Sequence, residues 1–137
     1  MERVVRHFQE ELGVLQERLL AMGGFAEERV REAVLGLASR DAALVDRVLG
    51  GDEPINDLHI EIDDRCFKLL ALHQPMAADL RAIVAAVKIN TDLERVGDLA
   101  VNIAEAGKRY LRHAPVKPLI DIPRMGELAQ SMLRDAL

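Results

Sequence analysis

Two carboxylates one helical turn apart are the residues of this chain whose spacing could support chemistry. Glu94 and Asp98 stand at positions i and i+4 of a segment with helical periodicity, so their side chains project from the same face. Paired carboxylates of this kind can share a metal cation, or they can simply face water. The spacing alone leaves both interpretations open, and the solvated surface is the commoner one.

A second polar stripe could face this carboxylate pair. Asp52, Asn56, His59 and Asp63 recur at steps of four, three and four residues on one flank of a preceding helix. Because adjacent antiparallel helices lie about 8–10 Å apart, His59 and Asp63 could meet the carboxylate pair across a groove. Oxygen ligands with one imidazole suit Fe, Mn, Mg or Zn. The alternative, a histidine that merely flanks the core, is commoner than a ligand.

The sequence carries no recognisable catalytic motif. It has no Glu-x-x-His pair of the ferritin-like oxidases, no HExxH, no phosphate-binding loop and no Cys/His zinc set. Nothing in it resembles an activated nucleophile with its base. The sequence therefore predicts a protein that is not an enzyme.

Helical periodicity predicts the elements that must position the polar stripes. Apolar residues at steps of three and four predict helices over 4–39, 42–72 and 76–112. Asp41 is the predicted N-cap of the second helix, and Pro75 permits a tight reversal before the third. Long helices joined by short turns must be antiparallel neighbours. We therefore expect an all-α fold, an up-down-up three-helix bundle.

Glycine and proline mark the interruptions of this pattern. Gly23-Gly24 predicts a kink or a close-packing point in the first helix. Gly50-Gly51 perturbs the second helix before Pro54 restarts it.

The chain divides into a three-helix bundle at 1–113 and a second part at 114–137. The second part begins with a proline-rich linker and ends within an amphipathic fourth helix, which starts near Met125. Nothing obvious in the sequence covers the apolar face of this incomplete helix. We expect a truncation, or a helix completed by another chain in a homo-oligomer.

Composition and charge narrow the class of protein. Half of the 137 residues are apolar, with three Phe, one Tyr and no Trp, so an aliphatic core is expected. The net charge of −5 argues against nucleic acid as a partner. The single cysteine, Cys66, cannot form an internal disulfide and is compatible with a reducing cytosol. No segment approaches the roughly 20 apolar residues of a membrane span, so membrane contact would be peripheral or through a partner.

Four sequence motifs resemble the first repeat of the PhoU family of bacterial phosphate-transport accessory proteins. They are MGG at 22–24, INDLHIEIDDRC at 55–66, LLALHQPMAADLR at 69–81 and DLERVGDLAVNIAE at 92–105. The resemblance implies a cytoplasmic negative regulator of phosphate uptake and phosphate-starvation signalling. Such an adaptor would link the ATPase subunit of the phosphate ABC transporter to a sensor histidine kinase.

The same resemblance implies metal binding through E(D)-x-x-x-D motifs, with iron expected first and Zn, Mn or Mg as alternatives. Glu94 and Asp98 match the third-helix motif fully, whereas the second-helix motif reads His59 to Asp63. An imidazole in place of a bridging carboxylate favours a mononuclear or weaker site over a carboxylate-bridged cluster. Asn102 is a further expected polar contact.

Two alternative functions stay open at this point. One is a metal-free helical bundle with a structural or protein-interaction role, whose acidic stripe is solvated. The other is the PhoU-like domain of a sodium/phosphate cotransporter, which the lack of a membrane segment disfavours.

Overall fold

Five helices make up the part of the chain that the computed structural model describes, residues 2–51 and 53–137. No strand occurs within these residues, and the prediction of an all-α fold is confirmed. The helices are α1 (Glu2–Ala38), α2 (Ala42–Leu49), α3 (Glu53–His73), α4 (Ala77–Tyr110) and α5 (Asp121–Ala136).

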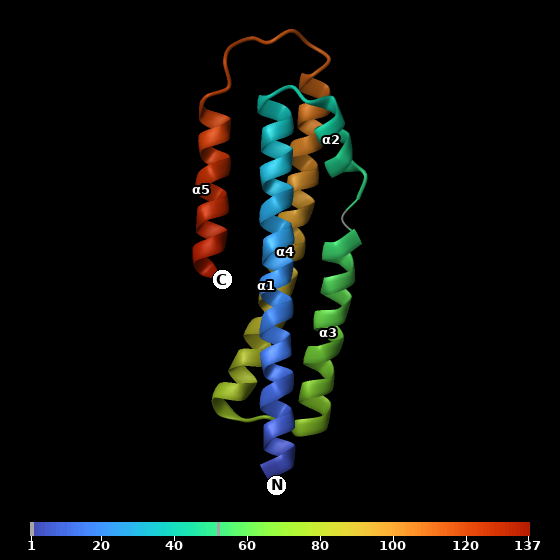
Figure 1. The fold of residues 1–137 in the computed structure, drawn as a ribbon, viewed down its shortest axis with the longest axis vertical. Helices are drawn as coiled ribbons and strands as arrows, with labels where there is room; N and C mark the ends of the chain where they lie inside the picture. Colours follow the sequence, from blue (N-terminus) through green and yellow to red (C-terminus); the bar gives the residue numbers. More distant parts are fainter. Residues whose placement is uncertain (1, 52) are drawn as a thin grey trace.

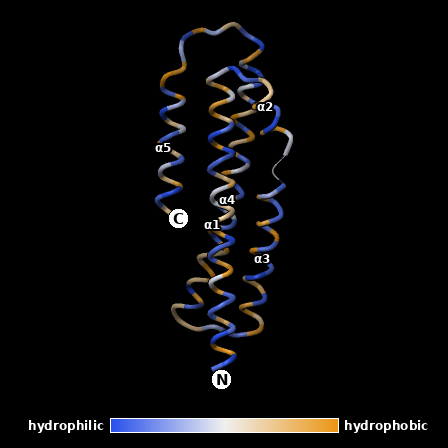
Figure 2. Tube along the Cα trace, in the orientation of Figure 1, coloured by the Kyte–Doolittle hydropathy of each residue, from blue (hydrophilic) through white to orange (hydrophobic). Residues whose placement is uncertain are grey.

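The bundle consists of three long antiparallel helical segments and one added helix (Figure 1). Helix α1 runs up and contacts every other helix, α2 and α3 together run down, and α4 runs up beside them. Helix α5 then descends along α1 and ends part of the way down the bundle. Apolar and polar residues alternate along each helix (Figure 2), as expected of amphipathic helices that share a core.

The predicted second helix is two helices, because the chain breaks at the glycine pair. Gly51 has a φ of 128°, a conformation that an L side chain rarely adopts. Asp41 caps α2 as predicted, since its Oδ1 accepts a hydrogen bond from Leu44 N at 3.1 Å. Asp52, the first member of the predicted polar stripe, lies outside the described residues.

Helix α1 continues through the other glycine pair without interruption. Gly23 is buried there, and the side chain of Leu137, which directly follows α5, occupies the space that a Cβ would need. The sequence predicted either a kink or a close-packing point at this glycine pair, and Gly23 is a close-packing point.

Two aliphatic clusters form the core. The larger cluster surrounds Met22, Ile62 and Ile83 and joins α1, α3 and α4. The smaller cluster contains Val45 and Val48 of α2 with small residues of α1 and α4. The composition had predicted an aliphatic core of this kind.

Helix α5 packs along one side against α1 of the same chain, but most of the apolar face for which the sequence showed no cover stays exposed. Gly126 is buried against Val34, and Leu133 packs against the larger core cluster. The other face of α5 is exposed, with Met125, Leu128 and Met132 at the surface. The domain division at residue 113 stays a prediction.

Candidate functional site

The junction of α3 and α4 brings three of the predicted site residues together. The Nε2 atom of His59 lies 2.7 Å from Glu94 Oε2 across the two helices. The same nitrogen lies 3.8 Å from Asp63 Oδ2, one turn further along α3. Two carboxylates and one imidazole thus meet at the partly exposed edge of the bundle, as the spacing predicted.

Asn90 supports this group from below and was missed by the sequence analysis. It is 0% exposed, and its Nδ2 donates hydrogen bonds to the His59 carbonyl and to Asp63 Oδ1, both at 3.0 Å. Helical spacing places this position on the core stripe of α4, between Ile83 and Leu93. A polar residue on an otherwise apolar stripe was the signal that could have identified Asn90.

Two polar atoms at this site are buried without a hydrogen-bond partner in the described part of the chain. They are His59 Nδ1 and Asn90 Oδ1. Buried polar groups are nearly always paired, since an unpaired one loses its hydration and gains nothing in return. A partner for these two atoms, such as a water molecule, an ion or a ligand, would therefore have to come from outside the described residues.

The remaining predicted ligands stand apart from this group. Asp98 lies one turn beyond Glu94, and Asn102 one turn further, and both are exposed. Neither takes part in a hydrogen bond or ion pair with another residue that the structure describes. The structure therefore assembles His59, Asp63 and Glu94, and leaves Asp98 and Asn102 on the adjoining surface.

The donor set suits a transition metal in its chemistry, since imidazole and carboxylate are common ligands. Its arrangement is that of an ion pair, because the two carboxylates lie around the imidazole nitrogen itself rather than around an open centre. No group of three or more His, Cys, Asp or Glu side chains in residues 2–51 and 53–137 is placed to hold a metal ion. Binding would require Glu94 to turn away from His59.

Cys66 lies beside this group and is held in its neutral form. Burial raises the pKa of the Cys66 thiol to about 11, and the negative charge of Asp63 adds to the shift. Because a thiol rather than a thiolate is present near neutral pH, Cys66 is a poor nucleophile and a poor metal ligand.

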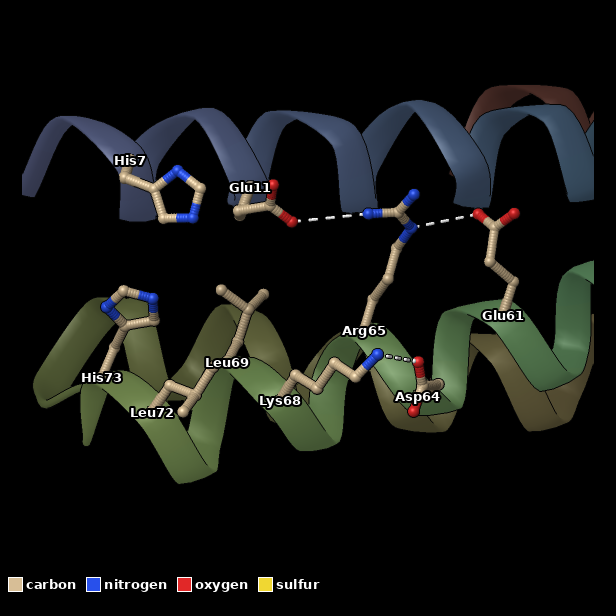
Figure 3. A pocket seen from close by; sticks show the side chains of 9 residues that line it. All are labelled: His7, Glu11, Glu61, Asp64, Arg65, Lys68, Leu69, Leu72 and His73. Atoms are coloured by element: carbon tan, nitrogen blue, oxygen red, sulfur yellow. Dashed lines mark hydrogen bonds and ion pairs between the residues drawn. The ribbon is translucent and has the colours of Figure 1, made fainter. Parts of the chain in front are cut away.

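A cavity of about 350 Å³ lies between α1 and α3 on another side of the molecule (Figure 3). Arg65 spans it, pairing with Glu11 of α1 at 3.4 Å and with Glu61 at 3.0 Å. Lys68 pairs with Asp64 at 2.8 Å at its rim. The sequence analysis named none of these residues, and charges of opposite sign are matched throughout.

Comparison with known proteins places these features in a family context. The PhoU domain matches residues 19–107. The phosphate-specific transport system accessory protein PhoU homologue of Caulobacter vibrioides is 44% identical, over 99% of this chain and 60% of its own length. The homologue of Aquifex aeolicus is 36% identical, over 93% of this chain and 58% of its own. The chain thus spans about 60% of the length of these two relatives.

A solved structure shares the fold. The crystal structure of PhoU from Pseudomonas aeruginosa superposes with a TM-score of 0.88 at 35% identity. The match covers 94% of this chain and 62% of that chain. In the described residues, no helix combines the length and the apolar character that crossing a membrane requires.

Proposed function

This chain belongs to the PhoU family, and from that premise we propose that it is a negative regulator of phosphate uptake and phosphate-starvation signalling. The observation that carries the proposal is the match of most of its length to accessory proteins of the phosphate-specific transport system. An accessory protein of this kind works through binding, and the proposal assigns it no catalytic role.

The proposed partners are the ATPase subunit of the phosphate ABC transporter and a sensor histidine kinase, met at the cytoplasmic face of the membrane. An adaptor between them needs surfaces whose affinity differs between the states of the transporter. A test is a phosphate-starvation reporter in cells with and without the chain. Loss of the chain should raise the reporter in phosphate-replete medium, and an unchanged reporter would count against the regulatory role.

We further propose that the junction of α3 and α4 holds a metal ion, iron first among the candidates. Glu94 and Asp98 would supply carboxylates from α4, and His59 and Asp63 would supply an imidazole and a carboxylate from α3. Asn102 would lie at the edge. The support is the meeting of His59, Asp63 and Glu94 over the unpaired buried atoms.

Elemental analysis of natively purified protein tests the metal site. The wild type should carry metal, and the double variant Glu94→Ala/Asp98→Ala should carry none while its circular dichroism is unchanged. Glu53 and Asp57 provide a matched control, because they are also exposed carboxylates at i and i+4, on α3. Their double alanine variant should keep the metal.

Stoichiometric metal retained by the Glu94/Asp98 variant would defeat the site assignment. A wild type without metal would leave the other interpretation, a metal-free bundle that binds proteins. The regulatory proposal does not depend on this result, because the reporter experiment tests it separately.

A further inference from the structure

The groove between α3 and α4 changes character along its length. Its lower half is apolar, and Phe67 of α3 is 72% exposed there. Leu80, Val84 and Val87 recur at steps of four and three on α4, and all three are exposed. A cavity of about 450 Å³ lies at this point, and Phe67, Leu70, Val87 and Asp63 are among the residues that line it.

The same stripe of α4 becomes acidic in its upper half. Glu94 and Asp98 continue the line of Val84 and Val87, because residues at such steps share a helix face. On α3, Asp63 lies one turn from His59, which contacts Glu94 across the groove, and about half of the Asp63 side chain is exposed. The acidic end is thus directly continuous with the apolar end.

Basic groups near the groove do not cancel this charge. His59 lies between Asp63 and Glu94, but one imidazole there faces two carboxylates, and Asp98 has no ion pair with another described residue. Lys68 is already paired with Asp64. Lys88 and Arg95 are exposed, but each follows a groove residue by one position and so points about 100° away round the helix. The surface is therefore an apolar patch with an aromatic anchor at one end and carboxylates at the other.

We propose that this groove docks an amphipathic helix of a partner protein, a helix with one apolar face and a basic end. Its apolar side chains would cover Phe67, Val84 and Val87, and its basic end would lie on Asp63, Glu94 and Asp98. Helices commonly bind in apolar grooves through anchors at i, i+3, i+4 and i+7, and an exposed aromatic residue is the typical anchor. The inference rests on the proposed adaptor role and specifies the chemistry of its partner.

Charge complementarity selects this occupant over two others. An anionic membrane surface would be repelled by the three carboxylates. The exposed apolar face of α5 on a second copy is a poorer match, because its residues are interspersed with Glu127 and other charges of both signs. Only a basic end matches the acidic half of the groove.

A synthetic helical peptide tests the proposal. Leu80 to Asp98 spans about 27 Å at 1.5 Å per residue, so a peptide of about 18 residues matches the groove. The probe has leucines on one face and three lysines at its N-terminal end, where the helix dipole adds positive charge. A matched peptide carries glutamates in place of the lysines. Fluorescence anisotropy measures both in the presence of a chelator, so the result is independent of any bound metal.

The basic peptide should bind at least about tenfold more tightly than its acidic counterpart at low salt, with affinity that falls as salt rises. Phe67→Ser should weaken binding about tenfold, and Glu94→Gln/Asp98→Asn should reduce both affinity and salt dependence. Leu35→Ser is the control, because Leu35 is an exposed apolar residue of α1 at 45% exposure. That variant should bind like the wild type.

Three outcomes would overturn the proposal. The first is equal binding of the two peptides, and the second is binding that Phe67→Ser leaves unchanged. The third is self-association of the peptide-free protein, seen by light scattering, that Phe67→Ser abolishes, since a second copy would then occupy the groove. Circular dichroism of each variant confirms that the fold is retained.

Discussion

Helix α3 presents two polar surfaces that differ in how their charges are matched. Toward α1, Arg65 lies between Glu11 and Glu61, and Arg18 of α1 pairs with Glu61 at 3.0 Å. Toward α4, two carboxylates share one imidazole, and two buried polar atoms have no partner among the described residues. The first surface is balanced and the second is not.

This difference separates a structural role from a functional one. Partly exposed ion pairs contribute between about 0 and 1 kcal/mol each, and matched pairs between two helices need no further explanation. An unpaired buried polar atom costs roughly 1–3 kcal/mol. Proteins tolerate such costs mainly at functional sites, which is why the α3–α4 junction is a better candidate than the charged cavity of about 350 Å³ on the α1 side.

The largest effect on stability is expected from Asn90→Ala. The substitution removes two hydrogen bonds and leaves a small cavity at a fully buried position, so the free energy of unfolding should fall by about 2 kcal/mol. Urea unfolding at constant m-value measures it. Asn102→Ala, at an exposed position of the same helix, should change it by less than about 0.5 kcal/mol. Equal effects of the two variants would show that Asn90 does not hold the junction together.

A smaller effect is expected from Arg65→Met on the balanced surface. The substitution keeps the apolar stem, removes the ion pairs to Glu11 and Glu61 and leaves Arg18 to pair with Glu61. The free energy of unfolding should fall by about 1 kcal/mol at low salt, and by less at high salt. Arg112→Met, at an exposed position, provides the control. A loss larger than that of Asn90→Ala would reverse the comparison between the two surfaces.

Much of this architecture could be predicted from the sequence because it depends on local periodicity. The helices, the Asp41 cap and the facing of His59 toward Glu94 follow from spacing and from the distance between neighbouring helices. The sequence predicted one perturbed helix where the structure has α2 and α3. A glycine pair lowers helix propensity, but it does not specify the conformation that Gly51 adopts.

The rest depends on contacts between residues far apart in the chain. Helix α5 packs on α1 through the contact of Gly126 with Val34 and through an ion pair between Arg134 and Glu27. Local spacing reveals neither contact. Asn90 was missed because one polar residue in an apolar stripe does not indicate what it bonds to. Asp98 shares a face with Glu94, but a shared face does not place it within reach of α3.

The smallest change in the free energy of unfolding at neutral pH is expected from substituting Cys66. This substitution tests the junction of α3 and α4 selectively. Burial raises the pKa of its thiol from 9.0 to about 11, so the folded state holds this proton more tightly than the unfolded state. Its contribution to stability is therefore complete below about pH 9 and is lost as the pH rises through about 11.

Urea midpoints of the wild type should fall relative to Cys66→Ala between about pH 8 and pH 10.5. Asp63→Asn should reduce this difference, because the charge of Asp63 contributes to the shift. If the wild type and Cys66→Ala lost stability in parallel, the thiol would have to be open to water, and the junction of α3 and α4 would be looser than its buried Asn90 indicates.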